Sequence, residues 1–120
     1  MKAAMDNVTL LGETAFVHMG RVPSADDLVI VADFLMKLAE ATWSVVSGIH
    51  DAKLVVIFRN AGFRRDAGRR AHEAFGDLGS AGGHQSTARA EIPLTAIDAQ
   101  ASGPTDYARF VRGRLKKSNR

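Results

Sequence analysis

Hydrophobic residues recur along the chain with two different periods, which predict a mixture of helices and strands. Between Leu28 and Leu38 they return every three or four residues, as on the buried face of a helix. The acidic pair Asp26–Asp27 follows Ser24, a helix-capping residue type, and suits the positive end of a helix. The pattern therefore predicts a helix over about residues 25–40 that packs against a sheet.

Four shorter segments are rich in β-branched, aromatic and aliphatic residues and are typical of strands. They span residues 15–20, 42–47, 53–58 and 87–94. The segment 53–58 is apolar on both faces, which favours a central strand. A short turn at residues 48–51 separates it from the preceding strand, so the two are expected to form an antiparallel hairpin.

Two further helices follow from capping residues and apolar stripes. A helix over about 66–75 can begin at Asp66, although Gly68 weakens it by roughly 1 kcal/mol relative to alanine. A last helix begins at Thr105–Asp106 and ends in a basic turn. The segment 76–83 holds four glycines and is predicted to have no regular structure.

These elements predict an α/β fold with a small mixed sheet of about four to five strands packed with two to three helices. The 120 residues fit one domain, and a hydrophobic content of 46% is enough for a core. Residues 1–13 are assigned to a linker or the end of an upstream segment, and 14–97 to the domain itself. Residues 98–120 are assigned to a linker and a basic C-terminal helix.

Composition narrows the classes of function. The chain has no cysteine, which excludes disulfides, thiolate metal sites and cysteine catalysis. It has no membrane-spanning apolar run and no signal-like N-terminus, so we expect no membrane partner and a cytoplasmic location.

Charge is divided unevenly between the two halves of the chain. Residues 1–58 hold four Lys/Arg and seven Asp/Glu, a net of −3, whereas residues 59–120 hold twelve and six, a net of +6. An anionic partner is therefore sought in the C-terminal half. A solvated surface with a basic tail explains the same distribution.

The turn Gly82-Gly83-His84 is the main candidate for a binding site. Glycines let backbone N–H groups approach an anion, and a histidine beside them can donate a hydrogen bond to a phosphate oxygen. The hydroxyl of Ser80 offers a further donor. Taken alone, such a turn is more often a glycine-rich connection with a surface histidine, so its neighbours decide the interpretation.

Basic and polar residues follow the predicted central strand. Arg59 offers a planar guanidinium suited to phosphate, and Asn60 can contact a base or ribose edge. Arg64 and Arg65 add charge to the same loop, and the helix that starts at Asp66 offers N–H groups that favour anions. Because loops at strand ends are common ligand sites, we predict a phosphate pocket here. The alternative is that the arginines serve solubility.

No catalytic or metal-binding residue is predicted. The histidines His18, His50 and His72 lack zinc-ligand spacing and are assigned core, surface or capping roles. Ser80 and His84 lack an orienting acid and an oxyanion hole. Neither a Walker motif nor a GxGxxG fingerprint occurs.

An ordered set of motifs resembles the C-terminal DHH-associated domain of DHH phosphoesterases, which include RecJ-like exonucleases, oligoribonucleases and cyclic dinucleotide phosphodiesterases. The motifs are Arg59-Asn60, Asp66-Ala67-Gly68, and Gly82-Gly83-His84 followed by Ala88-Arg89-Ala90-Glu91-Ile92-Pro93. The resemblance covers about residues 14–95. The Gly-Gly-His tripeptide alone is a weak signal, whereas the ordered set with its spacing is fairly specific.

The resemblance implies a substrate-binding domain that closes over a separate N-terminal catalytic domain. That domain would carry an Asp-His-His motif and a manganese pair that hydrolyses the phosphodiester. Gly82, Gly83 and His84 would contact a phosphate of a nucleotide or short oligonucleotide, and Arg59 and Asn60 would contact the nucleotide. The sequence contains neither the Asp-His-His motif nor an acidic cluster for two metals. The chain is therefore expected to be the substrate-binding part of a hydrolase, with no cofactor of its own.

Two alternatives stay open. A related domain occurs in alanyl-tRNA synthetases, where it helps bind tRNA, and the basic C-terminal helix would suit a nucleic-acid-binding module without phosphodiesterase context. The other alternative is a domain without a ligand, which forms a homodimer through the apolar face of that helix. The sequence also leaves open whether Arg89 faces the ligand or pairs near Glu91.

Overall fold

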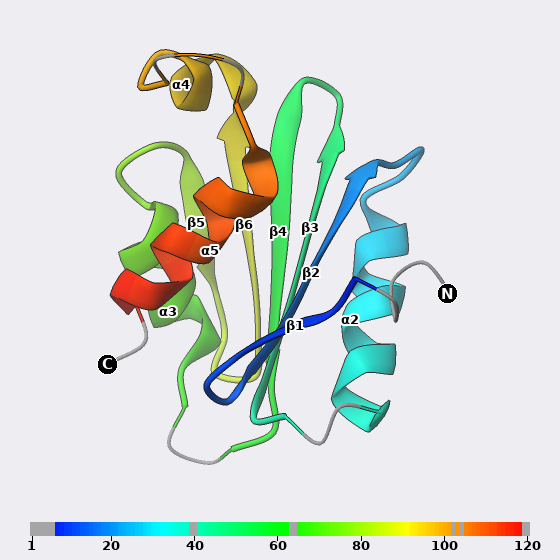
Figure 1. Cartoon of the computed structure of the whole chain (residues 1–120). Helices are drawn as coiled ribbons and strands as arrows, with labels where there is room; N and C mark the ends of the chain where they lie inside the picture. Colours follow the sequence, from blue (N-terminus) through cyan, green and yellow to red (C-terminus); the bar gives the residue numbers. More distant parts are fainter. Residues whose placement is uncertain (1–6, 39–40, 63–64, 102, 104, 119–120) are drawn as a thin grey trace.

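A mixed sheet forms the centre of the molecule, with helices on both of its faces (Figure 1). The computed structural model describes residues 7–38, 41–62, 65–101, 103 and 105–118. In these ranges the strands are β1 (Thr9–Leu11), β2 (Thr14–Arg21), β3 (Trp43–His50), β4 (Lys53–Asn60), β5 (Ser80–Gly83) and β6 (Thr87–Pro93). The helices are α2 (Asp26–Leu38), α3 (Ala67–Phe75), α4 (Leu94–Asp98) and α5 (Tyr107–Ser118). The predicted α/β class is confirmed.

The sheet has the order β1-β2-β3-β4-β6-β5. Strands β2 and β3 are parallel and are joined through α2, as a parallel pair requires a crossover connection. The other neighbouring strands are antiparallel, including the predicted β3–β4 hairpin. Strand β4 lies between β3 and β6 and is buried from Leu54 to Phe58, which confirms its central position.

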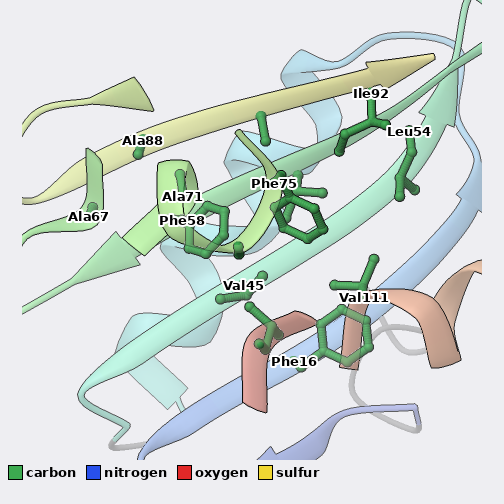
Figure 2. Close-up of a cluster of buried hydrophobic side chains, with 14 of the residues drawn as sticks. Phe16, Val45, Leu54, Phe58, Ala67, Ala71, Phe75, Ala88, Ile92 and Val111 are labelled. Atoms are coloured by element: carbon green, nitrogen blue, oxygen red, sulfur yellow. The ribbon is translucent and has the colours of Figure 1, made fainter. Parts of the chain in front are cut away.

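Alternating residues of the central strands supply two separate cores. On one face, Val55 and Ile57 of β4 pack with Leu28 and Leu35 of α2. On the other face, Phe58 packs edge to face on Phe75 of α3, with ring centroids 6.2 Å apart. Figure 2 shows this second core, to which buried residues of β2, β4, β6, α3 and α5 contribute. The side-chain period of two in β4 therefore fixes which helices lie on which face.

Three elements differ from the sequence prediction. Ser80–Gly83, in the segment expected to have no regular structure, forms the edge strand β5. Thr9–Leu11, in the segment 1–13 that we assigned to a linker or the end of an upstream segment, pairs with β2 as β1. A short helix occupies Leu94–Asp98. The described part of the chain thus has six strands and four helices, more than the four to five strands and two to three helices expected. An edge strand is held by backbone pairing on one side, so it can be glycine-rich or very short. Such a segment has no hydrophobic period from which a strand could be predicted.

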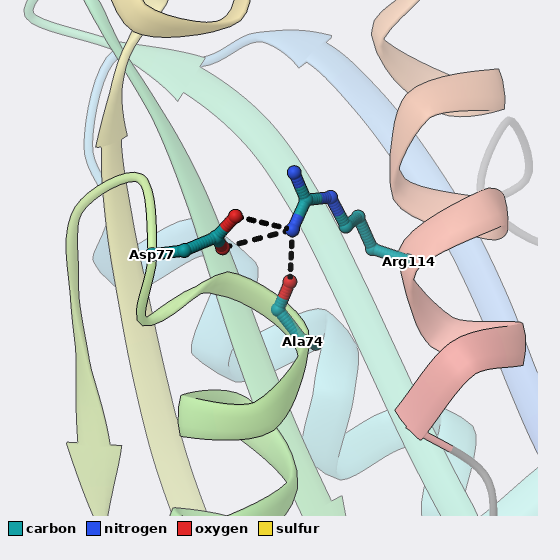
Figure 3. A network of polar contacts seen from close by, with 3 residues as sticks. All are labelled: Ala74, Asp77 and Arg114. Atoms are coloured by element: carbon teal, nitrogen blue, oxygen red, sulfur yellow. Dashed lines mark hydrogen bonds and ion pairs between the residues drawn. The ribbon is translucent and has the colours of Figure 1, made fainter.

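The C-terminal helix α5 belongs to the core. Its residues Val111 and Leu115 are fully buried against α3 and the sheet. Arg114 contacts both carboxylate oxygens of Asp77, at 2.8 and 2.9 Å, and the carbonyl oxygen of Ala74 at 3.3 Å (Figure 3). The hydrogen bond from Arg114 lowers the pKa of Asp77. The apolar face of α5, considered above as a dimer interface, is therefore occupied within the chain.

No helix in the described ranges is long and apolar enough to span a membrane.

The β3–β4 turn offers a test of this backbone. Asp51 and Ala52 have φ angles of 55° and 61°, as a two-residue type I′ hairpin requires. An alanine with a positive φ is strained by roughly 1–2 kcal/mol, and glycine avoids this strain. Part of the gain is lost, because glycine has a greater conformational entropy in the unfolded state. We expect Ala52→Gly to raise the free energy of unfolding, measured by urea denaturation, by about 0.5 kcal/mol.

The matched control is Ala99→Gly, because Ala99 has an ordinary helical φ of −61° and is exposed. Ala99→Gly should lower the free energy of unfolding, because glycine loses more conformational entropy on folding than alanine. Equal effects of the two substitutions would show that the turn lacks the strain described here.

Candidate functional site

The Gly-Gly-His segment leads into a tight turn between β5 and β6. The backbone N–H of His84 donates to the carbonyl of Thr87 at 2.8 Å and closes this turn. The three carbonyl groups from His84 to Ser86 all accept hydrogen bonds from neighbouring elements. The backbone of the turn is therefore held from one side.

The first partner of the turn is the start of α3. The N–H of Ala67 donates to Gln85 O at 2.8 Å, and the N–H of Gly68 donates to His84 O at 2.9 Å. Asp66 caps the helix as predicted, because its carboxylate accepts from the Arg69 N–H at 3.1 Å. The expectation that this helix start offers free N–H groups to an anion is thus wrong, since a protein carbonyl or carboxylate already occupies each of these three donors.

The second partner is Asn60 at the end of β4. Its side-chain Nδ2 donates to Gln85 O at 2.6 Å, and its backbone N–H donates to Ser86 O at 3.1 Å. One residue thus fixes two successive carbonyls of the turn. Asn60 therefore positions the turn. Its side-chain amide and its backbone N–H both donate to carbonyl groups of the turn.

The outer side of the turn carries free donors. The residues from His84 to Ser86 are exposed. Within the described part of the chain, the backbone N–H groups of Gln85 and Ser86 have no hydrogen-bond partner. Successive free N–H groups on an ordered turn form a concave donor site for anions, and the imidazole of His84 lies in the same segment.

The two glycines of the motif differ in their surroundings. A Cβ on Gly83 would lie 2.5 Å from Thr87 O and 2.6 Å from Ala88 Cα. A Cβ on Gly68 would lie 2.8 Å from Gly83 O, so α3 packs directly on the backbone of β5. A Cβ on Gly82, in contrast, meets nothing within 4 Å. Gly83 therefore permits close packing, whereas Gly82 leaves open space on the surface.

Strand register shows which side chains share a face with Gly82. Gly82 pairs with Arg89, and Arg89 pairs with Ile57, which lies in the core under α2. Arg59 pairs with Thr87 on this same face of the sheet. On this face α2 packs against β3 and β4, and Figure 1 shows it at the opposite side of the sheet from β5 and β6.

The predicted pair Arg59–Asn60 is therefore split between the two faces. Arg59 Nε lies 2.8 Å from Asp33 Oδ1 of α2, whereas Asn60 contacts the turn. Arg89, left open by the sequence, pairs with Glu91 at 2.9 Å and keeps 43% of its side chain exposed. Sequence reasoning missed Asp33 as a neighbour of the site, because helix capping and periodicity say nothing about the contact from α2 to the end of β4.

The remaining predicted residues lie apart from the turn. Ser80 pairs with Glu91 at the opposite end of β5. Arg64 lies outside the described residues, and Arg65 forms an ion pair with Glu13 at 3.0 Å.

The three histidines outside the motif do not contribute to the candidate site. His18 Nδ1 lies 2.8 Å from Ser47 Oγ, and burial lowers its pKa. His50 Nδ1 lies 3.2 Å from Val22 O, and His72 is exposed on α3. Among the residues that the structure describes, no group of three or more His, Asp or Glu side chains could hold a metal ion.

Comparisons with solved structures define the class of fold. An exopolyphosphatase-related protein from Bacteroides fragilis superposes on 97% of this chain with a TM-score of 0.67 and 14% identity. A pGpG-specific phosphodiesterase from Vibrio cholerae also matches 97% of the chain, with a TM-score of 0.54 and 9% identity. The chain corresponds to 33% and 38% of these two proteins. The C-Ala domain of alanyl-tRNA synthetase from Aquifex aeolicus matches 78% of the chain and is itself covered to 93%, with a TM-score of 0.57 and 13% identity.

In sequence, a relative is an uncharacterised protein from Methanocaldococcus jannaschii. It is 33% identical over 93 residues, which is 78% of this chain. The chain spans only 19% of the length of that protein. No family model matches the chain. The chain thus shares its fold with part of two phosphoesterase-related proteins and with a tRNA-synthetase domain, and its sequence with a segment of a much longer protein.

Proposed function

We propose that this chain is a substrate-binding domain of a DHH-type phosphodiesterase. It holds a phosphate of a nucleotide or short oligonucleotide at the turn that follows Gly82-Gly83, while a separate metal-bearing domain performs hydrolysis. The fold shared with part of an exopolyphosphatase-related protein and of a pGpG-specific phosphodiesterase supports this role. The ordered motifs from Arg59 to Pro93 support it independently.

The outer side of the turn at residues 84–86 carries the proposal. A phosphate group offers only hydrogen-bond acceptors, so it requires donors that the protein has not already used. The N–H groups of Gln85 and Ser86 meet this requirement, and the imidazole of His84 adds a third donor. Asn60 and α3 fix the inner side, so the donors are arranged before the ligand arrives and less ordering entropy is lost on binding.

Arg59 and Arg89 extend this site along the face of the sheet that they share with Gly82. Each forms an ion pair with a carboxylate, Arg59 with Asp33 and Arg89 with Glu91. Guanidinium groups are planar donors suited to phosphate, and each retains N–H groups beyond those facing its partner. We infer that they contact the second phosphate or the sugar of a ligand whose first phosphate is at the turn.

In this proposal, hydrolysis is assigned to a separate domain and substrate binding to the present chain. Among the described residues, those around the turn included, no group of three or more His, Asp or Glu side chains could hold a metal ion. By the resemblance, manganese would be held by the Asp-His-His domain. The present chain would then determine how the substrate is positioned and would leave bond cleavage to its neighbour.

The proposal can be tested by titrating the full chain with a 5′-phosphorylated dinucleotide in a calorimeter at several salt concentrations. A pocket for one or two phosphates should give a shallow dependence, with a slope of log K on log salt of about −1. Binding without saturation, or no heat at any concentration, would contradict a defined pocket.

The fold of the C-Ala domain favours a second candidate, a nucleic-acid-binding module without phosphodiesterase context. The basic final turn of α5, with Lys116 and Lys117, would then contribute a broad basic surface. This reading predicts a steep salt dependence, with a slope of about −3 or more, and tighter binding of longer oligonucleotides. The same titration therefore separates the two functions.

A further inference from the structure

Arg70 of α3 is a buried charge that has no counter-ion among the residues that the structure describes. Its residue exposure is 5%, and in the described part of the chain no carboxylate forms an ion pair with it. Its partners are all neutral: Thr14 Oγ1 at 2.9 Å, Ser118 Oγ at 3.2 Å and Leu115 O at 3.4 Å. Buried charges in proteins are ordinarily paired or bind an ion, because desolvation of a lone charge is costly.

The guanidinium retains donors and faces an aromatic ring. Of its five N–H groups, three are used in the hydrogen bonds above, which leaves two. Its Cζ lies 4.6 Å from the ring centroid of Trp43, a contact that favours the charged form. Burial nevertheless lowers the pKa of Arg70 to about 10, so the group still carries its charge at neutral pH.

Arg70 lines a cavity of about 340 Å³. The β1–β2 turn contributes Leu11 and Gly12, and α5 contributes Leu115 and Lys116. This volume lies at the lower end of the range for small-ligand sites, roughly 300–1,000 Å³. A second cation, Lys116, thus lines the same cavity as Arg70, while the other lining residues are apolar or glycine.

We propose that this cavity binds an oxyanion, a phosphate or carboxylate group, with Arg70 as its principal ligand and Lys116 at its edge. A planar fork with two remaining donors fits two oxygen atoms of one such group. The site is separate from the turn at residues 84–86 and shares no lining residue with it. It would give the domain a second anion-binding position on the α3–α5 face of the sheet.

The chain contains an internal reporter for this site. Trp43 is its only tryptophan, and its ring contacts the guanidinium. We expect a saturable change in tryptophan fluorescence when inorganic phosphate replaces chloride at constant ionic strength. Saturation by acetate as well would identify a general oxyanion site, and saturation by phosphate alone would restrict it to phosphate groups. The absence of any saturable change with either ion would overturn the proposal.

Variants locate the response. Arg70→Gln should weaken phosphate binding at least about tenfold, as expected when a charge-assisted pair is lost. Arg69→Gln is the matched control, because it removes the same charge from the next residue, whose side chain is 76% exposed and paired with Glu73. A response that persists in Arg70→Gln and disappears in His84→Ala would place the ion at the β5–β6 turn and refute the second site.

A second pair of variants serves if Arg70→Gln does not fold. Lys116→Glu leaves Arg70 intact and introduces a carboxylate beside the cavity, so it should compete with phosphate and weaken binding about tenfold. Lys117→Glu changes the charge equally at an exposed neighbour that does not line the cavity. Equal effects of the two substitutions would reflect general surface charge and would contradict a defined pocket.

Discussion

Replacing Gly83 with alanine is expected to lower the free energy of unfolding by about 3 kcal/mol, because the new methyl group has no space. It would lie 2.5 Å from Thr87 O and 2.8 Å from Ala88 Cβ. On its other side the backbone of Gly83 lies against Gly68 of α3, so the strand cannot move away without displacing the helix. The φ of 157° at Gly83 further disfavours a side chain.

Gly82→Ala provides the control within the same motif. Its Cβ meets nothing within 4 Å, so the free energy of unfolding should change by less than about 0.5 kcal/mol. Urea denaturation of both variants measures the difference. If the two glycines have equal effects on stability, the close contact between α3 and β5 is not as described. If Gly82→Ala keeps the fold and weakens dinucleotide binding, the open side of the motif faces the ligand.

The second large effect is expected in binding. His84→Ala should weaken the affinity for a 5′-phosphorylated dinucleotide by at least about tenfold, because it removes a donor that can carry charge. The melting temperature should stay nearly constant, since His84 is exposed and its fixed contacts involve only backbone atoms. Calorimetric titration and a thermal melt of the same samples measure both quantities.

His72→Ala is the appropriate control for this substitution. His72 is also exposed, but it lies on α3 away from the β5–β6 turn. Its replacement should leave the affinity unchanged. A large loss of stability in His84→Ala, with affinity lost only in proportion, would make His84 a structural residue and would contradict its proposed role.

The sequence predicted those elements that have a strong hydrophobic period or a capping residue. Strand β4 is apolar on both faces because it lies between two neighbours and under helices on each side. Helix α3 starts at Asp66, where a carboxylate satisfies a backbone donor. Both signals are local in the sequence, so reading them needs no knowledge of the tertiary structure.

The arrangement of the site could be predicted only in part. The segments around Arg59, Asp66 and His84 do meet at one end of the sheet, as the resemblance implied. That Asn60 and α3 bind the carbonyls of the turn depends on contacts between distant segments, as does the contact of Arg59 with Asp33. The sequence also did not indicate that Arg70 would be buried without an ion pair among the described residues, because such burial has no signature in the sequence.

The turn between β5 and β6 thus has two different sides. Its inner side is hydrogen-bonded to α3 and Asn60, and its outer side offers free N–H donors. Amide chemical-shift mapping of the full chain with a 5′-phosphorylated dinucleotide tests this account most directly. We predict saturable shifts at the backbone amides of His84, Gln85 and Ser86, and at Gly82. Shifts confined to α5, or none in the β5–β6 turn at saturation, would contradict the proposed phosphate site.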